Sequence, residues 1–390
     1  MRATVVRRKA YLRLHPGRTV SSRGSEPAEL ATNRIFFDPI YAPDGKSIYC
    51  IGNSANVYGL WRIPIKDTTG ELAGEPLEVR SAETFPIRHM SISADGSKIA
   101  YSLRPLTSDI WTVPVSLATG EGTGSAVPLM EDRSVRKTNP AISPDGSKIG
   151  IGVWRSGGPP LVWLIDADGK NPGPLSTSGV GSTLPGWLSN DEISYQTLRQ
   201  GAPNTIEAKN LKSGVERVLF TPTPDMDFYR LSPDGNQIAF NSNKGGTINI
   251  WKSQIAGGPA IQLTFDKELM GWPTWSPDGR FLAFEMKRGD DTQLAIMPAQ
   301  GGEIKQLTFD HGQSWPHSWS PDGSMVTFAG LRNGVWNIFT VSARDGVQKQ
   351  LTEFDKFNTY VRYPAWSPRG NQIVFEKAVM TGNIWVMELK

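Results

Sequence analysis

The sequence predicts an all-β protein, a β-propeller of about eight four-stranded blades. Three observations predict this class. A turn motif of the form Ser-Pro-Asp-Gly recurs along the chain, its copies lie 44 to 51 residues apart, and no segment between them has the 3.6-residue period of an amphipathic helix. The 40 Gly and 29 Pro among 390 residues agree with this class, because short strands joined by many turns need both.

The motif is most complete in the stretch Trp272–Phe284. Pro277 presets φ near about −65° for a turn, Asp278 can hydrogen-bond the nearby backbone, and Gly279 accepts the positive φ that a side chain would resist. Leu282 and Phe284 then alternate with smaller or polar neighbours, as in a half-buried strand. The stretch therefore predicts a strand, a tight turn and a second strand.

Eight copies of the motif follow one another, and the copy at Asn190 is degenerate. The residues at the Asp position of the turn are Asp44, Asp95, Asp145, Asn190, Asp234, Asp278, Asp322 and Arg369. After the two strands around the turn, each unit has a third strand with an Asn/Asp-Ile-Trp pattern and a fourth that ends in Leu-Thr. Four antiparallel strands per repeat of this length are typical of a propeller blade. We therefore predict one propeller domain over residues 26–390.

The chain ends suggest how the propeller closes. The eighth repeat stops at Lys390, just after its third strand, so its outer strand is missing. Residues 26–32 resemble the fourth-strand stretch at residues 258–264. We expect this N-terminal strand to complete the last blade, because pairing it there removes a strand edge that invites aggregation.

Charge divides the chain into a tail and a body. Residues 1–25 carry seven basic side chains and no acidic one, and we predict a disordered tail there. The rest has 34 basic and 38 acidic residues, so the body lacks the positive surplus that a phosphate footprint needs. We expect no nucleic-acid partner.

The sequence indicates neither a membrane span nor an export signal. No run of 18 apolar residues occurs, and Arg7-Arg8 is followed by neither an apolar core nor a small-residue cleavage site. The expected compartment is the cytoplasm by default, or the periplasm if the N-terminus is incomplete. Cys50 is the single cysteine, which excludes an intrachain disulfide and a cysteine zinc cluster. We predict no cofactor and no metal site.

The repeat resembles that of the TolB-type propellers, a WD-repeat-like family whose motif reads W-S-P-D-G-x-x-I-A-F, followed by I-W and Q-L-T. Here the matching residues are Trp275–Phe284, Ile250-Trp251 and Gln262–Thr264. The resemblance covers about residues 26–390 and extends to the propeller domains of dipeptidyl-peptidase-type proteins and to sensor-like halves of bacterial regulators. It implies recognition of proteins or peptides. The chain departs from TolB in having eight repeats where TolB resembles a six-bladed form, and in lacking the preceding α/β domain.

The sequence predicts no catalytic group. A serine hydrolase needs a G-x-S-x-G elbow, and no such pentapeptide occurs. A metal-dependent lyase, like the oligogalacturonate lyases, would need His89, His311 and His317 to converge at one end of the channel. Asp166–Asn171 resembles half a calcium loop, but it falls where other repeats turn between strands, and we interpret it as a hairpin turn.

The segments that lead into the inner strands hold the candidate ligand contacts. In a propeller these segments cluster around one mouth of the channel. Aromatic residues beside arginines suit a peptide, a carboxylate or a sugar, through stacking and bidentate hydrogen bonds. The candidates are Phe85, Arg88, His89, Arg136, Tyr229, Arg230, Trp272, Trp315, His317, Arg362 and Tyr363. The alternative is that aromatics such as Trp272, Trp315 and Tyr363 only pack between blades.

The function that these observations favour is a non-enzymatic protein or peptide interaction module, a scaffold with its ligand surface at the channel mouth. A small molecule or sugar is a further ligand class. One alternative is a propeller-based hydrolase or metal-dependent lyase. Another is the sensor half of a bacterial regulator that lacks its N-terminal domain, which the basic, non-repeat residues 1–25 favour.

Overall fold

A computed structural model describes most of the chain. The described residues are 18–19, 28–29, 35–54, 57–66, 72–81, 87–103, 107–132, 134–155, 158–177, 180–199, 203–223, 225–380 and 382–389. None of them is helical, and every pair of neighbouring strands is antiparallel. No helix in this part of the chain could therefore cross a membrane. The predicted all-β class is confirmed: seven four-stranded sheets and one three-stranded sheet correspond to the eight repeats.

Backbone contacts divide the chain into two compact units. The first unit comprises residues 1–106, 155–158 and 380–390, and the second comprises residues 107–154 and 159–379. The predicted disordered tail over residues 1–25 lies outside the described residues, except for β1 (Arg18–Thr19), which pairs with β2 (Ala28–Glu29). A single domain over residues 26–390 stays a prediction.

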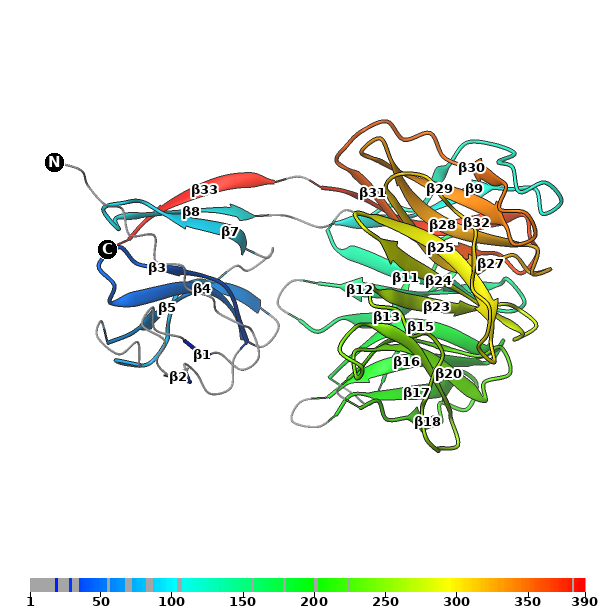
Figure 1. Ribbon diagram of the computed structural model, residues 1–390, viewed down its shortest axis with the longest axis horizontal. Coiled ribbons are helices and arrows are strands. Elements are labelled where there is room, and N and C mark those ends of the chain that lie inside the picture. The colour runs from blue at the N-terminus through cyan, green and yellow to red at the C-terminus, as the bar shows by residue number, and fades with distance from the viewer. Residues whose placement is uncertain are drawn as a thin grey trace. The chain divides into compact units, whose positions relative to one another are not determined.

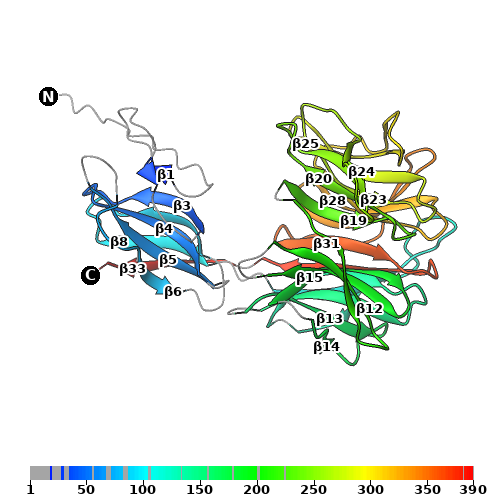
Figure 2. The ribbon, with the colours of Figure 1, turned by 90° about the horizontal axis from the view of Figure 1, so that it is seen from below.

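The first unit holds the first two repeats. One sheet contains β3 (Ile35–Tyr41), β4 (Ser47–Ser54), β5 (Val57–Pro64) and β6 (Leu77–Ser81), in that order (Figure 2). The other has β8 (Lys98–Leu103) at its centre, with β7 (Ile87–Ile92) on one side and β33 (Asn383–Glu388) on the other. The C-terminal strand thus completes a sheet of the second repeat.

The second unit holds six four-stranded sheets (Figure 1). Five of them follow chain order: β11 (Arg136–Ile142), β12 (Lys148–Trp154), β13 (Leu161–Asp166) and β14 (Gly173–Pro174); β15 (Gly181–Ser189), β16 (Glu192–Leu198), β17 (Thr205–Asn210) and β18 (Glu216–Phe220); β19 (Met226–Leu231), β20 (Gln237–Ser242), β21 (Asn249–Gln254) and β22 (Ile261–Gln262); β23 (Met270–Trp275), β24 (Phe281–Arg288), β25 (Asp291–Pro298) and β26 (Lys305–Gln306); β27 (Gln313–Trp319), β28 (Met325–Arg332), β29 (Val335–Ser342) and β30 (Gln348–Gln350). The sixth contains β31 (Thr359–Trp366), β32 (Gln372–Val379), β9 (Ser108–Pro114) and β10 (Val127–Met130).

These six sheets form a closed ring. The first strand of each sheet contacts its counterpart in a neighbouring sheet, as β19 does β23 and β23 does β27, and β31 contacts β11 to close the circle. Between the β15–β18 sheet and the β19–β22 sheet, the joint is an apolar core that includes Ile206, Tyr229 and Phe240. The second unit is therefore a six-bladed propeller, with its inner strands around the axis.

The predicted closure by an N-terminal strand is wrong. Of residues 26–32 the structure describes Ala28–Glu29, which pairs with β1, while β9 and β10 fill the two outer positions beside β32. Figure 1 shows β9, near the start of the chain, among the strands at its end.

The physical reason is that two third strands are interchangeable. Strand β9 contains Asp109-Ile110-Trp111, and β33 contains the matching Asn383-Ile384-Trp385. In β32–β9, Trp111 is the partner of Phe375, and in β8–β33, Trp385 is the partner of Tyr101. Both pairings have the aromatic-to-Trp register of β20–β21, where Phe240 faces Trp251. The second and eighth repeats have thus exchanged their third strands.

The Ser-Pro-Asp-Gly motif makes turns, as predicted. Ser276 Oγ and the backbone N of Arg280 both donate hydrogen bonds to Asp278 Oδ1, at 2.6 and 3.0 Å, and Gly279 has φ 70°. Bonds of the same kind, from the motif serine and from the residue after the glycine, lower the pKa of Asp95, Asp145 and Asp278 to about 2. The row of acidic residues in the sequence is therefore structural.

The tryptophan before the turn joins neighbouring sheets. Trp275 Nε1 donates to the carbonyl oxygen of Arg230 at 3.0 Å, and Trp319 Nε1 donates to that of Thr274 at 3.1 Å. Trp187 makes the same bond to Ala141 at 2.9 Å. In each case the acceptor is on the preceding inner strand, so this tryptophan is part of the blade joint.

Candidate ligand site at the propeller axis

A β-bulge interrupts the first strand of each sheet, six residues before the turn Asp. In β23, Gly271 is the partner of Glu285 and Thr274 that of Ala283, so Trp272 and Pro273 together face Phe284. The first bulge residue has a positive φ, between 44° and 53°, in Asp38, His89, Asn139, Leu184, Phe228, Trp272 and Tyr363. The seventh repeat has Pro316 there, whose ring holds φ negative.

These bulges place large side chains in strained backbone around the axis. A bulge redirects side chains away from the regular alternation of a strand and is frequent beside functional sites. The left-handed region costs a residue with a side chain about 1 to 2 kcal/mol, and bulky residues are uncommon there. Phe228, Trp272 and Tyr363 nevertheless occupy it. Clustered strain of this kind motivates a functional hypothesis.

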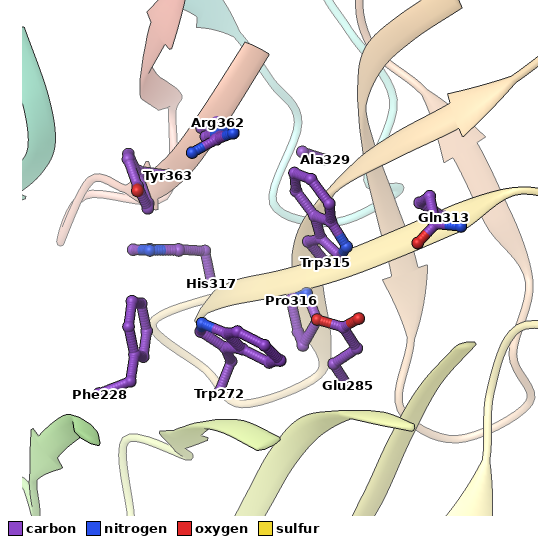
Figure 3. Close-up of a pocket in the computed structure, with 10 residues that line it drawn as sticks. All are labelled: Phe228, Trp272, Glu285, Gln313, Trp315, Pro316, His317, Ala329, Arg362 and Tyr363. Atoms are coloured by element: carbon purple, nitrogen blue, oxygen red, sulfur yellow. The ribbon is translucent and has the colours of Figure 1, made fainter. Parts of the chain in front are cut away.

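A cavity of about 310 Å³ opens beside these residues (Figure 3). Its walls come from four successive inner strands, β19, β23, β27 and β31, together with β24 and β28 behind them. The lining residues are Phe228, Trp272, Glu285, Gln313, Trp315, Pro316, His317, Ala329, Arg362 and Tyr363. We call this space the axial cavity; it lies entirely within the second unit.

Arg362 is the permanent charge in the cavity wall. Its guanidinium lies 4.0 Å from the ring centre of Tyr360 and 5.4 Å from that of Trp315, which are cation–π distances. Its Nε is buried without a hydrogen-bond partner. Glu376 is its cross-strand partner, but that carboxylate pairs with Arg136 Nε at 3.0 Å. Among the described residues, no carboxylate forms an ion pair with Arg362 within 4.0 Å.

Glu285 is a buried carboxylic acid in the same wall. Its side chain is 6% exposed, and burial raises its pKa to about 7, against hydrogen bonds from Thr292 and Trp315 that lower it. Below about pH 7 this group is therefore mostly neutral and can donate a hydrogen bond. Figure 3 shows Glu285 and Arg362 on separate elements of the cavity wall.

His317 lines the cavity and is contacted from behind by Arg230, which does not line it. Arg230 Nη2 lies 3.2 Å from His317 Nε2, and its guanidinium lies 5.0 Å from the ring centre of Phe228. Burial lowers the pKa of His317 well below its ordinary 6.5, and the charge of Arg230 adds to this effect. His317 is therefore neutral near pH 7, with Tyr363 packed against its ring at 4.9 Å.

Arg136 contacts the cavity wall from outside the cavity. Burial lowers the pKa of Arg136, but its contacts with Glu376 and Tyr363 raise it by more, so the net shift is upward. The Arg136–Glu376 pair joins β11 to the adjacent β31–β32 sheet, at the contact that closes the ring. Arg136 is thus in contact with Tyr363 but does not line the axial cavity.

The structure brings together some of the predicted site residues. Trp272, Trp315, His317, Arg362 and Tyr363 line the axial cavity, while Arg230 and Arg136 contact its wall. Tyr229 instead packs into the core between two sheets, 8% exposed, as the packing alternative expects.

The remaining candidates belong to the first unit or lie outside the description. Phe85 lies outside the described residues. Arg88 and His89 are in β7; the side chain of Arg88 is not described, and His89 is exposed. The axial cavity therefore forms without these three residues.

Sequence reasoning missed five lining residues: Phe228, Glu285, Gln313, Pro316 and Ala329. A positional signal exists for most of them. Phe228 and Pro316 lie six residues before a turn Asp, at the position of Trp272, and Glu285 and Ala329 lie seven after one. Aligning the repeats position by position would have selected these residues.

The histidines of the lyase alternative have other partners. His311 Nδ1 lies 2.9 Å from Asp291 Oδ2, and His317 faces Arg230. In the part of the chain that the structure describes, no three His, Cys, Asp or Glu side chains gather as metal ligands would.

Comparisons with known proteins agree with the fold. Residues 230–390 match the family model of the TolB beta propeller domain. A solved TolB-type structure from Agrobacterium tumefaciens is 18% identical, covers 70% of this chain and 98% of its own, and has a TM-score of 0.56. TolB from Acinetobacter baumannii is 19% identical, covers 81% of each chain, and has a TM-score of 0.52. No curated protein matches the sequence.

At these identities the similarity of the structures shows the fold alone. The family model adds the repeat type, because it matches the stretch that carries three complete turn motifs and the variant with Arg369. With the antiparallel blades and the repeated turn, these matches show a TolB-like β-propeller fold, with the repeat of the TolB propeller family over residues 230–390.

Proposed function

We propose that this protein is a non-enzymatic recognition module that binds a peptide or an exposed protein segment at the axial cavity. The observation that carries the proposal is the use of strained bulges to present aromatic side chains at the axis. Phe228, Trp272 and Tyr363 all line the cavity from left-handed backbone. Small residues at these bulge positions would cost less backbone strain on folding, so we take ligand binding as the simplest reason for the large aromatic residues.

The chemistry of the wall suits a peptide. Trp272 and Phe228 contact one another edge to face at 5.9 Å and offer apolar surface, while Gln313 and Glu285 offer hydrogen-bonding groups. Mostly apolar walls with a few polar groups are typical of ligand pockets. The resemblance to TolB-type propellers, which implies protein or peptide recognition, supports the same ligand class.

The test is peptide selection against the immobilised full-length chain, with displayed random peptides and measurement of Kd for the selected sequences. Trp272→Ala and Trp315→Ala are expected to weaken binding at least about tenfold, because aromatic anchors dominate such interfaces. Phe309→Ala is the matched control: Phe309 is 74% exposed and does not line the cavity. If the selected peptides bind the Trp variants and the control equally, the axial cavity is not the recognition site.

A further inference from the structure

We propose that the axial cavity, resting on the function proposed above, takes a free carboxylate on an apolar or aromatic residue, namely the C-terminus of a peptide, with Arg362 as its anchor. The proposal names the part of the peptide that enters the cavity. Four features of the cavity support it: the charge of Arg362 without an ion-pair partner, the orientation of its guanidinium, the acid Glu285 elsewhere in the wall, and the volume of the space.

The first step is the unpaired charge of Arg362. Arginine stays protonated in proteins and carries five N–H donors in a planar fork. In this wall its Nε is buried without an acceptor. Its cross-strand partner, Glu376, binds Arg136 through Oε1, and Glu376 Oε2 makes no hydrogen bond to Arg362. A buried donor without an acceptor is costly, and a carboxylate is the acceptor that matches the guanidinium in two parallel bonds.

The second step is the orientation of the guanidinium. Trp315, Trp336 and Tyr360 form an aromatic cluster, with ring centres 4.3 Å apart for the Trp pair and 5.1 Å for Trp336 and Tyr360. Arg362 lies over Tyr360 and Trp315 of this cluster. Stacking covers the faces of a guanidinium and leaves its N–H edge free to donate. Arg362 is therefore held ready for an anion.

The third step is the carboxylic acid elsewhere in the cavity wall. Glu285 is the carboxylic acid of the cavity wall, and an ionised side chain there would repel an incoming carboxylate. Burial keeps Glu285 mostly neutral below about pH 7, so it can donate to the ligand. His317, the histidine of the cavity wall, is neutral near pH 7 as well.

The fourth step is size and polarity. A volume of about 310 Å³ is at the small end for ligand pockets, which suits one terminal residue better than a chain that passes through. The ring faces of Phe228, Trp272 and Tyr363 favour an apolar or aromatic side chain. A phosphate group fits less well, because dianions are usually bound by several cations and this wall holds one permanent charge.

The experiment compares matched acids and amides on the full-length chain. The peptide Gly-Gly-Gly-Gly-Phe and N-acetyl-phenylalanine are titrated calorimetrically as free carboxylates and as C-terminal amides. The acids are expected to bind about tenfold more tightly than their amides, as one charge-assisted pair would give. A peptide acid that binds more tightly than N-acetyl-phenylalanine points to a chain terminus, and equal affinity points to a small carboxylic acid.

Variants assign the effect to one side chain. Arg362→Gln is expected to reduce the affinity of the acid to that of the amide and to leave the amide unchanged. Arg362→Lys keeps the charge without the planar fork and is expected to give an intermediate preference. Arg217→Gln is the matched control, because Arg217 lies on strand β18, away from the cavity, and already forms an ion pair with Glu192. Circular dichroism of each variant checks its folding.

The outcomes separate this inference from the proposed function. Equal binding of acid and amide by the wild-type protein, a comparison that needs no variant, would overturn the carboxylate site. So would an acid preference that survives in Arg362→Gln, or binding by none of the four probes. If selected peptides still depend on Trp272 while acid and amide bind equally, peptide recognition at the cavity stands and the carboxylate anchor does not.

Discussion

Replacing Glu285 by Gln gives the sharpest test of the cavity's electrostatics. The side chain is 6% exposed, and burial raises its pKa from 4.5 to about 7. When the pKa of a carboxylic acid is higher in the folded than in the unfolded state, its whole contribution to the free energy of unfolding is present below the unfolded pKa. That contribution is lost as the pH rises from about 4.5 through about 7, because the unfolded chain ionises first. A difference of this size corresponds to about 3 kcal/mol between the two ends of the range.

Gln keeps the shape and the neutral hydrogen-bonding capacity of the protonated acid without a titration. Glu285→Gln is therefore expected to match the wild type at about pH 4.5 and to be more stable by up to about 3 kcal/mol at about pH 8. The measurement is the urea-unfolding midpoint at four pH values across this range, converted with a common slope.

The control for this variant is Glu376→Gln, which removes an equally buried carboxylate that is paired with Arg136 at 3.0 Å. It is expected to lower stability at every pH, because it leaves a partly buried guanidinium without its partner. A Glu285→Gln effect that is the same at both ends of the pH range, or a variant less stable than the wild type at about pH 8, would refute the reasoning.

Three further predictions concern the backbone, the strand pairing and the cysteine. Because Trp272 has φ 53°, Trp272→Gly is expected to be more stable than Trp272→Ala by about 1 kcal/mol in thermal unfolding. In ordinary strand backbone the Ala variant would be the more stable one. Equal or lower stability of the Gly variant would show that the backbone at residue 272 is not strained. Ala100 and Val386 are partners in β8–β33, so a double cysteine variant at these positions is expected to form a disulfide, whereas cysteines at Ala100 and Thr112 are not. A disulfide between the latter pair, read from gel mobility and mass, would mean that β8 pairs with β9 and would favour the single-domain prediction. Burial raises the pKa of the Cys50 thiol to about 12, so Cys50 is expected to react with a thiol reagent after unfolding and not before, and fast labelling of the native protein would contradict this.

The blades could be predicted from local patterns because their signals are local. A Pro-Asp-Gly turn such as residues 277–279 needs positive φ at Gly279 and a hydrogen-bonding Asp278, and both requirements are visible in the residue types. The closure could not be predicted in this way. Asp109-Ile110-Trp111 and Asn383-Ile384-Trp385 fit the same register beside either partner, so local pairing energy does not distinguish them.

The residues of the candidate site were likewise predictable from the sequence only in part. Trp272, Trp315 and Arg362 were selected because aromatics and arginines before the inner strands suit recognition, and they line one cavity. Tyr229 is the second residue of the bulge in β19, and its ring packs into the core, whereas Phe228 just before it lines the cavity. Glu285 was missed because a charged residue in a strand reads as a solvent-facing position.

The sequence by itself determined the repeat, the turn in each blade and the all-β class, since these depend on residues within a few positions of one another. The tertiary structure decided which third strand completes which sheet, which side chains the bulges direct to the axis, and that a buried Glu285 lines the same cavity as Arg362. These features depend on contacts between segments that are far apart in the chain. The state of charge of a side chain depends on its neighbours in space, and a linear pattern does not contain them.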